Sequence, residues 1–245
     1  MTFDFFLVAL PAVLLTGISK GGFGGAFGGL AVPLMALVLP PTQAAAVMLP
    51  ILCMADLVGL KRFYGKWDVR NLKIMLPGAL LGVLIGSLTF GVFSERFVGL
   101  LLGAISIGFV LINALVDRAA AQVAEPAVGK GTLLSAVAGF TSFVAHAGGP
   151  PVMMYLLPQH LEKLRYVATI NAFFLLTNAI KLIPYAWLGQ FSVDNLLASL
   201  SLVPVVVVGV WLGLWLQGRV NHLWFYRIAR LGLLVTGIQL IVQNW

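Results

Sequence analysis

The sequence predicts an all-α polytopic membrane protein with two inverted-topology repeats, each a broken or re-entrant helical hairpin followed by three transmembrane helices. Three observations predict this fold: the composition, the order of the apolar segments, and two matching glycine-rich interruptions. The 245 residues are 60% hydrophobic and only 9% charged, with a mean hydropathy of +1.02. A water-soluble domain carries about 25% charged residues. The chain therefore has too little polar surface for a water-soluble globule.

Ten apolar segments fall into two sets of five. They lie near residues 4–18, 24–39, 42–60, 71–92 and 97–116 in the first half, and near 131–145, 150–158, 166–187, 193–216 and 223–243 in the second. A helix that spans a hydrocarbon core of about 30 Å needs roughly 20 residues. The last three segments of each set approach this length, and the first two are shorter. We expect a first repeat over 1–116, a linker over 117–130 and a second repeat over 131–245, within one membrane domain.

Glycine-rich stretches interrupt the two halves at corresponding places, between the two short segments. The first stretch runs from Ser19 to Gly29, and the second runs from His146 to Pro151. In membrane proteins with internal repeats, paired interruptions of this kind are the best sequence indication of a binding site. A half-helix that starts at such a break presents free amides and a positive dipole end, which favour an anion. For either break taken singly, a turn or close helix packing is the alternative.

Motifs that recur in the same order support the duplication. The stretch from Gly65 to Leu72 resembles the stretch from Gly189 to Leu196. A Pro-x4-Gly-x3-Gly pattern begins at Pro77 and again at Pro204. Small residues four apart allow helices to approach closely. We therefore assign a packing role to the spaced glycines Gly78, Gly82, Gly86, Gly99, Gly103, Gly209 and Gly213.

The distribution of positive charge predicts the orientation. The loop from Lys61 to Lys73 has five Lys and Arg residues and one acid, whereas its counterpart from Gly189 to Asn195 has no Lys or Arg. Because cytoplasmic loops are enriched in Lys and Arg, the first loop is expected inside and the second outside. Equivalent loops then face opposite sides, as in an inverted repeat. This places the linker in the cytoplasm and both termini outside it.

Several polar residues near the breaks are candidates for binding an anion. Lys20 is the most informative, because a Lys near mid-membrane costs at least ~2.5–3.5 kcal/mol. The alternative is that Lys20 lies at a helix end and reaches water. His146 is expected to occupy the analogous flank of the second break, where it either titrates or is a neutral, hydrogen-bonded side chain. The candidate binding residues are Ser19, Lys20, Gly21, Gly22, Gly24, Gly25, Gln43, Ser142, His146, Gly148, Gly149, Asn171 and Asn178.

Two acid–base groups are candidates for coupling transport to protons. His146 is one of them, and Asp56 is the other because it is the only acid well inside an apolar span. Pairing of Asp56 with a Lys or Arg is the alternative. Asn171 and Asn178 lie two helical turns apart on one face, where they either contact a ligand or hydrogen-bond neighbouring helices. A single cysteine, Cys53, excludes an intramolecular disulfide and a cysteine metal site, so no metal and no cofactor are expected.

The chain resembles the TauE/SafE sulfite exporter family over roughly residues 5–242. The resemblance is carried by the run from Gly17 to Gly25, the Gly65-Lys-Trp-Asp-Val motif and the stretch from Gly139 to Pro151. It implies a polytopic transporter of small sulfur-containing or organic anions, in many members outward across the bacterial inner membrane. This chain has Ala46-Val47-Met48 where many relatives have a small–Thr–Ser stretch. Hydroxyl contacts of those relatives therefore do not carry over.

The leading hypothesis is a secondary exporter of a small anion, such as sulfite, an organosulfonate or a carboxylate, that works by alternating access. The expected partners are this anion, the lipid bilayer and protons as a coupling ion, with no nucleic acid. An anion channel or a membrane assembly subunit without coupled transport is the alternative. A membrane enzyme is a weaker hypothesis, because Ser19, Ser142 and His146 offer only a poor nucleophile–base arrangement. Assembly as a homo-oligomer stays open.

Overall fold

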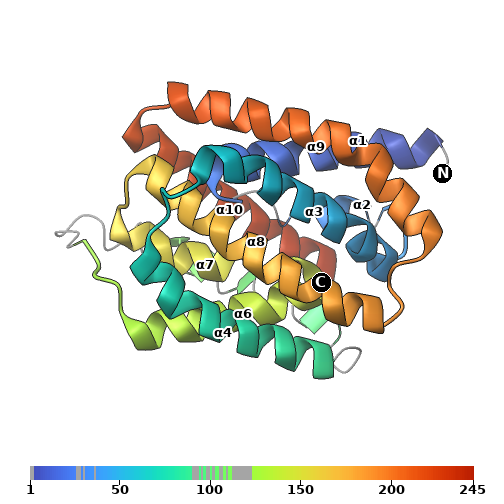
Figure 1. The fold of residues 1–245 in the computed structure, drawn as a ribbon, viewed down its shortest axis with the longest axis horizontal. Coiled ribbons are helices and arrows are strands. Elements are labelled where there is room, and N and C mark those ends of the chain that lie inside the picture. Colours follow the sequence, from blue (N-terminus) through green and yellow to red (C-terminus); the bar gives the residue numbers. More distant parts are fainter. Residues whose placement is uncertain are drawn as a thin grey trace.

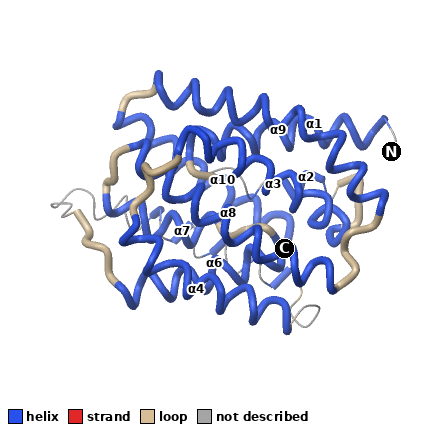
Figure 2. Tube along the Cα trace, in the orientation of Figure 1, coloured by secondary structure: helices blue, strands red, loops and turns tan. Residues whose placement is uncertain are grey.

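Long helices make up most of the computed structural model (Figure 1, Figure 2). The structure describes residues 3–25, 29, 31–35, 37–89, 94, 96–97, 100, 103–104, 107–108, 110–111 and 123–245. In the first half the helices are α1 (Phe3–Phe23), α2 (Ala31–Met35), α3 (Pro41–Phe63) and α4 (Val69–Leu88). In the second half they are α6 (Val128–Ala145), α7 (Gly149–Leu156), the 3-10 helix η2 (Leu157–Gln159), α8 (Lys163–Trp187), α9 (Val193–Arg219) and α10 (His222–Asn244).

Most predicted segments correspond to helices. The segments near 42–60, 71–92, 131–145, 150–158, 166–187, 193–216 and 223–243 match α3, α4, α6, α7 with η2, α8, α9 and α10. The first segment was expected to end at residue 18, but α1 continues to Phe23. Of the second segment, only α2 is helical among the described residues. The fifth segment, 97–116, lies largely outside the described residues.

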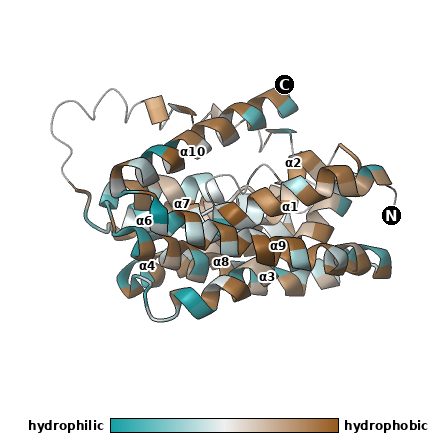
Figure 3. Ribbon diagram, turned by 90° about the horizontal axis from the view of Figure 1, so that it is seen from above, coloured by the Kyte–Doolittle hydropathy of each residue, from teal (hydrophilic) through white to brown (hydrophobic). Residues whose placement is uncertain are grey.

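Six helices among the described residues are long and apolar enough to cross a membrane: α1, α3, α4, α6, α8 and α9. Figure 3 shows hydrophobic residues along the middle of the helices and hydrophilic residues more often near their ends. Large side chains such as Leu80, Leu84, Leu200 and Trp211 are exposed on the outer faces. A surface of this kind is satisfied by lipid rather than by water. The chain is therefore a multi-pass helical membrane protein.

The helix connections gather at two ends of the bundle. At one end, which we call the basic end, Arg165 Nη2 lies 2.7 Å from Asp68 Oδ2 and Ala124 donates its amide to the carbonyl of Pro158 at 3.0 Å. This end holds the connections 64–68 and 157–162 and the stretch 123–127. The far end holds the start of α1 and the connection 188–192 (Figure 1). The predicted cytoplasmic loop and linker thus share one end, opposite the N-terminus.

Two close helix pairs join the halves. Gly17 faces Gly209, so that a Cβ on Gly17 would lie 2.8 Å from Gly209 Cα. Gly22 faces Gly213, and the rising numbers on both sides mean that α1 and α9 run in the same direction. In the second pair, a Cβ on Gly82 of α4 would lie 2.7 Å from the amide nitrogen of Phe140 in α6. Side chains would not fit between these backbones.

The packing role predicted for the spaced glycines is confirmed for Gly78, Gly82, Gly86, Gly209 and Gly213, each of which lies against the partner helix of its pair. Gly103 lies against Gly237 and Ile241 of α10. Gly99 lies outside the described residues.

The resembling motifs before α4 and α9 form the same local structure. Asp68 accepts a hydrogen bond from the amide of Asn71 at 2.9 Å, and Ser192 accepts one from the amide of Asn195 at 3.2 Å. Both are N-caps that satisfy a free amide of the first turn. Each cap therefore fixes the position of an asparagine one turn into its helix.

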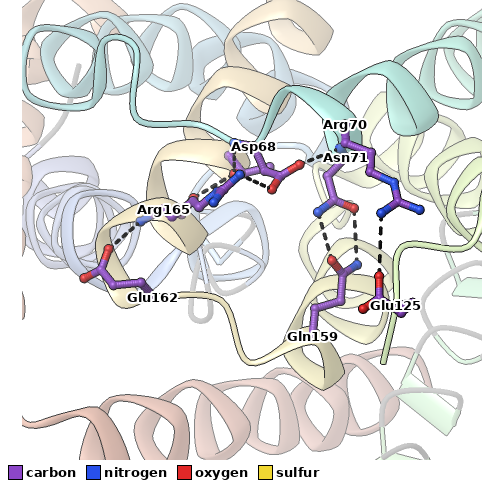
Figure 4. A network of polar contacts seen from close by, with 8 residues as sticks. Asp68, Arg70, Asn71, Glu125, Gln159, Glu162 and Arg165 are labelled. Atoms are coloured by element: carbon purple, nitrogen blue, oxygen red, sulfur yellow. Dashed lines mark hydrogen bonds and ion pairs between the residues drawn. The ribbon is translucent and has the colours of Figure 1, made fainter. Parts of the chain in front are cut away.

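Each of these asparagines is paired with a glutamine, at opposite ends of the bundle. Asn71 and Gln159 exchange two amide hydrogen bonds, of 2.8 and 3.2 Å. Gln43 donates one to Asn195 at 3.0 Å. Figure 4 shows the Asn71–Gln159 pair at the basic end, beside the ion pair of Asp68 and Arg165.

Candidate functional site

A small cavity of about 30 Å³ lies where the two helix breaks meet, and we call it the central cavity. It is deep in the bundle. Asp56 and Asn178 both line it, and each lies about 22 Å along its helix, α3 or α8, at ~1.5 Å per residue. These two helices start at opposite ends of the bundle. The predicted site residues that line the cavity are Lys20, Gly24, Gly25, Asp56, Ser142, His146, Gly149, Asn171 and Asn178.

The two breaks begin with the same left-handed bend. Helix α1 is followed by Gly24, with φ +60°, and α6 is followed by His146, with φ +51°. The next residues differ, because Gly25 also has a positive φ, of +78°, and Ala147 does not. After the bend, Gly25 donates its amide to the Ser19 carbonyl at 3.0 Å, and Ala147 donates its amide to the Thr141 carbonyl at 3.2 Å. Both bonds span six residues, as in a Schellman C-cap. Gly24 and His146 therefore occupy matching places in the two halves.

This match corrects the expected correspondence. His146 was expected to hold the place that Lys20 holds in the first half. Because Gly24 matches His146, the residue four positions earlier, Lys20, matches Ser142. A left-handed bend is uncommon at a residue other than glycine, and the second half carries the His146 side chain at the bend where the first half has a glycine.

The backbones of the two breaks touch. The carbonyl oxygen of Gly25 lies 3.3 Å from the position that a Cβ on Gly149 would take. Gly148 packs behind this contact, against Ser142 Cβ and the Phe174 ring. Gly149 also begins α7, and because Pro150 and Pro151 have no backbone N–H, this end of α7 can offer only the amides of Gly148 and Gly149. The two breaks are thus adjacent in space.

Gly21 and Gly22 do not form a wall of the cavity, contrary to expectation. Both lie inside α1 and face α9, where a Cβ on Gly22 would lie 2.5 Å from the carbonyl oxygen of Gly213. Ser19 is fully buried and belongs to the C-cap of α1. Gln43 lies at the far end of the bundle, hydrogen-bonded to Asn195. These four residues contribute to packing and helix capping rather than to the cavity lining.

Lys20 and Asp56 form an ion pair inside the cavity. The Lys20 Nζ lies 2.5 Å from Asp56 Oδ1, and the Asp56 side chain is almost fully buried. Asn178 donates to Asp56 Oδ2 at 2.8 Å, and Asn171 donates to Oδ1 at 3.4 Å. The carboxylate thus has its oxygens satisfied by three neighbours. Of the alternatives for Asp56 and Lys20, the structure has them paired with each other, with Lys20 still lining the cavity.

Sequence reasoning missed the importance of Lys181. Its side chain is fully buried, and its Nζ contacts Ser142 twice, donating to the carbonyl at 2.6 Å and to Oγ at 3.1 Å. It also lies 2.8 Å from His146 Nδ1 and 3.4 Å from Asn178 Oδ1. Its place on the same helix face as Asn178, three residues on, was the available signal. Lys181 does not line the cavity itself but contacts three residues that do, Ser142, His146 and Asn178.

Both ring nitrogens of His146 are engaged. Nδ1 lies 2.8 Å from Lys181 Nζ and Nε2 lies 3.0 Å from the Ala45 carbonyl. With Lys181 protonated, Nδ1 is the acceptor, and Nε2 carries the proton and donates to the Ala45 carbonyl. The Tyr185 hydroxyl lies 3.4 Å from Nε2 and donates to the Phe143 carbonyl at 2.9 Å. His146 is therefore a neutral, hydrogen-bonded side chain here, which was the alternative to a charged anion ligand.

Three polar groups remain available to a ligand in the cavity. The Ser142 hydroxyl accepts from Lys181 and donates to none of the described residues. Lys20 uses one of its three N–H groups on Asp56. The side-chain oxygen of Asn171 is buried and has no hydrogen-bond partner among the described residues. Two donors and one acceptor thus face a space that can hold a small polar molecule.

Comparison with known proteins decides the family. The model of the family described as Sulfite exporter TauE/SafE matches residues 9–240, nearly the whole chain. The chain belongs to the TauE/SafE family. No curated protein and no solved structure shows a significant match. The membership confirms the resemblance seen in the sequence motifs.

For a TauE/SafE protein, the expected activity is transport rather than catalysis. Membership of this family makes the chain a membrane transporter whose substrates are small anions, sulfite and related sulfur anions among them. The six long apolar helices in the described part of the chain agree with a multi-pass protein in a lipid environment.

Proposed function

We propose that this TauE/SafE protein is a secondary transporter that exports a small anion, such as sulfite, an organosulfonate or a related carboxylate, by alternating access. The anion binds in the central cavity, where the two helix breaks meet. One observation carries the proposal: the cavity receives a cationic donor from the first half, Lys20, and a hydroxyl donor from the second, Ser142. An oxyanion needs donors on more than one side, and this arrangement supplies them.

The depth of the cavity favours a transport site over a surface site. Ionisable residues at the middle of a membrane protein mark substrate or ion pathways by default, because they are costly to bury there. The cavity also borders the start of α7 at Gly149. The positive dipole end of a half-helix stabilises negative charge, and the amide of Gly149 can add a donor there, whereas Pro150 and Pro151 have none.

The helix pairs support two inverted repeats that move against each other. The first helix of the first half, α1, pairs with α9 of the second half, and α6, the first helix of the second half, pairs with α4 of the first. Two repeats related by a two-fold axis produce such an exchange of partners. Transporters with inverted repeats bind their substrate at the repeat interface and open to either side in turn.

The two ends of the bundle differ in how firmly they are joined. The basic end has the Asp68–Arg165 ion pair and the doubly bonded Asn71–Gln159 pair (Figure 4). The far end has one Gln43–Asn195 bond beside a hollow of about 450 Å³ lined by Phe5, Gln43 and Asp194, among others. On this proposal the structure corresponds to a state closed at the basic end.

We further propose that the basic end faces the cytoplasm of a bacterium, with both termini outside the inner membrane. Single cysteines introduced into a Cys53→Ala background at Lys66 and at Gln190 test this orientation. A membrane-impermeant thiol reagent added to intact spheroplasts is expected to label the cysteine at position 190 and to spare the one at position 66. The reverse labelling would contradict the orientation without affecting the transport proposal.

Transport in liposomes tests the function itself. Liposomes that contain the purified protein and are loaded with sulfite, methanesulfonate or acetate are expected to release the transported anion faster than protein-free liposomes loaded with the same anion. Ser142→Ala is expected to slow release about tenfold, because one lost hydrogen bond to a charged group is worth ~1.5–3 kcal/mol. Ser135→Ala, on the same helix and equally buried but bonded to Gly131, is the matched control. No release of any anion would refute the proposal.

The coupling assignment is tested in the same liposomes. We propose that protons couple to the anion through Asp56 or His146, so an imposed pH gradient should drive the anion against its own gradient. His146→Ala is expected to impair this accumulation. A channel would instead let the anion follow only its electrochemical gradient. Flux that ignores the pH gradient would therefore favour the channel alternative.

A further inference from the structure

The formal charges around the central cavity do not cancel. Lys20 and Asp56 neutralise each other in their ion pair. Lys181 has no carboxylate within 4 Å among the described residues, whose ion pairs are Lys20–Asp56, Arg70–Glu125 and Arg165–Asp68. Its neighbours Ser142, His146 and Asn178 are neutral in the arrangement described above. With Lys181 protonated, one positive charge therefore remains uncompensated at the centre of the bundle.

The other titratable side chains near Lys181 do not supply the missing negative charge. His146 accepts from Lys181 through Nδ1 and donates through Nε2, so it is neutral. The Tyr185 hydroxyl donates its proton to the Phe143 carbonyl. Cys53 packs with Leu49 and Tyr185 as a free thiol. A buried charge without a partner is strongly unfavourable, and an anion in the cavity would supply that partner.

Lys181 reaches the cavity through Ser142. Its Nζ donates to Ser142 Oγ at 3.1 Å, which leaves the hydroxyl proton of Ser142 to point elsewhere. Ser142 lines the cavity, whereas Lys181 lies behind it. The ammonium thus polarises the hydroxyl that faces the ligand, and hydrogen bonds in such chains strengthen one another.

We propose, building on the transport function proposed above, that Lys181 supplies the one net positive charge of the central cavity, so that the site prefers singly charged over doubly charged anions. Lys20 then contacts the anion without adding net charge, because Asp56 cancels it. Lys181 is a positioning and charge-setting residue that acts through Ser142. A dianion of the same shape would leave one negative charge uncompensated in a buried site.

Two anions of similar shape test the preference. Methanesulfonate carries one negative charge and sulfate carries two at neutral pH. Isothermal titration of the full chain in detergent, at matched ionic strength, is expected to give at least tenfold tighter binding of methanesulfonate. Equal or tighter binding of sulfate would overturn the proposal.

Charge-changing variants test the source of the preference. Lys181→Gln removes the ammonium and brings the net charge to zero, so methanesulfonate binding should weaken at least tenfold. Lys163→Gln, the same substitution on the same helix but outside the cavity, is the matched control and should leave binding unchanged. Asp56→Asn raises the net charge to two and should shift the preference towards sulfate.

A double variant distinguishes a loss of charge preference from a general loss of affinity caused by disturbing the ion pair. Lys20→Gln with Asp56→Asn removes the ion pair but leaves Lys181, so the preference for methanesulfonate should persist even if both affinities fall. Loss of the preference in this variant, or its persistence in Lys181→Gln, would overturn the proposal. Either result can coexist with normal anion release from liposomes, which would leave the transport function standing. Absence of release of any anion would refute the transport function, and the charge preference with it.

Discussion

The first helix of each half, α1 and α6, ends in the same left-handed bend, but the two bends carry different residues. In the first half the bend is Gly24, and the cavity is reached by Lys20, whose charge is cancelled by Asp56. In the second half the bend is His146, and Ser142 reaches the cavity with Lys181 behind it. The same left-handed bend is thus accompanied by the Lys20–Asp56 ion pair in the first half, and by the Ser142 hydroxyl with Lys181 hydrogen-bonded to it in the second. The two bends therefore share a backbone conformation and differ in the chemistry of the side chains around them.

The largest expected effect contrasts Asp56 with Asn178, which hold comparable places in α3 and α8. Asp56→Ala leaves Lys20 as an uncompensated buried charge, which costs about 3–5 kcal/mol. Asn178→Ala removes one hydrogen bond to that carboxylate and should cost about 1.5–3 kcal/mol. Thermal unfolding in detergent micelles measures both.

Removing the ion pair as a whole provides the control for this contrast. The double variant Lys20→Met with Asp56→Leu should recover most of the stability lost in Asp56→Ala, because an apolar pair replaces the buried ions. Equal destabilisation by the two single alanine variants would show that the charged half is no more sensitive than the neutral half.

The next largest effects on stability are expected at the two close helix pairs, α1 with α9 and α4 with α6. Gly139→Ala in α6 and Gly209→Ala in α9 place a methyl group against a partner backbone, and overpacking of this kind costs about 1–3 kcal/mol. Their matched controls are Gly129→Ala and Gly218→Ala, where a Cβ meets no atom within 4 Å. These controls should be neutral or should stabilise, by up to about 1 kcal/mol of helix propensity. Tolerance of only one of the two interior substitutions would show that the halves are packed unequally.

Breaking the amide pairs at the two ends of the bundle should give a smaller difference in stability. Asn71→Ala leaves Gln159 buried without its partner, at a cost of about 1–3 kcal/mol. Asn195→Ala frees Gln43, which is half-buried, so that water replaces the lost bond and the cost falls to about 0.5–1.5 kcal/mol. The difference in the midpoint of thermal unfolding between the two variants measures this asymmetry. The opposite order would argue against a basic end that is joined more firmly.

The smallest expected difference in stability is between two variants at the left-handed bend of the second half, and a substitution at the bend of the first half complements it. Ala at position 24 must adopt the left-handed conformation, at about 1–2 kcal/mol, and it would also press on the Tyr166 and Ile170 side chains. At position 146, both Gly and Ala lose the histidine hydrogen bonds, but Gly suits the bend. His146→Gly should therefore be more stable than His146→Ala by about 1 kcal/mol. Equal stabilities would mean that the bend at 146 is not held in the left-handed conformation.

The length and hydrophobicity of the apolar segments predicted the long helices well, because both are local properties of the chain. The motif-based assignment failed at Gly21 and Gly22, since a glycine that lets α9 approach looks the same in a sequence as a glycine that ends a helix. Lys181 was missed because it stands in an apolar helix with no motif, and only tertiary structure brings it to Ser142. The correspondence of His146 with Gly24 was also hidden, because the matched feature is a backbone angle and not a residue type.

The exchange of helix partners between the halves has a consequence for synthesis at the membrane. The partner of Gly17 is Gly209, about 190 residues later, which at ~5–20 residues per second is synthesised roughly 10–40 s after it. During that time the glycine face of α1 meets lipid or a protein of the insertion machinery. Neither half can complete its own helix pairs. We therefore expect the two halves, expressed from separate genes, to accumulate only when they are produced together.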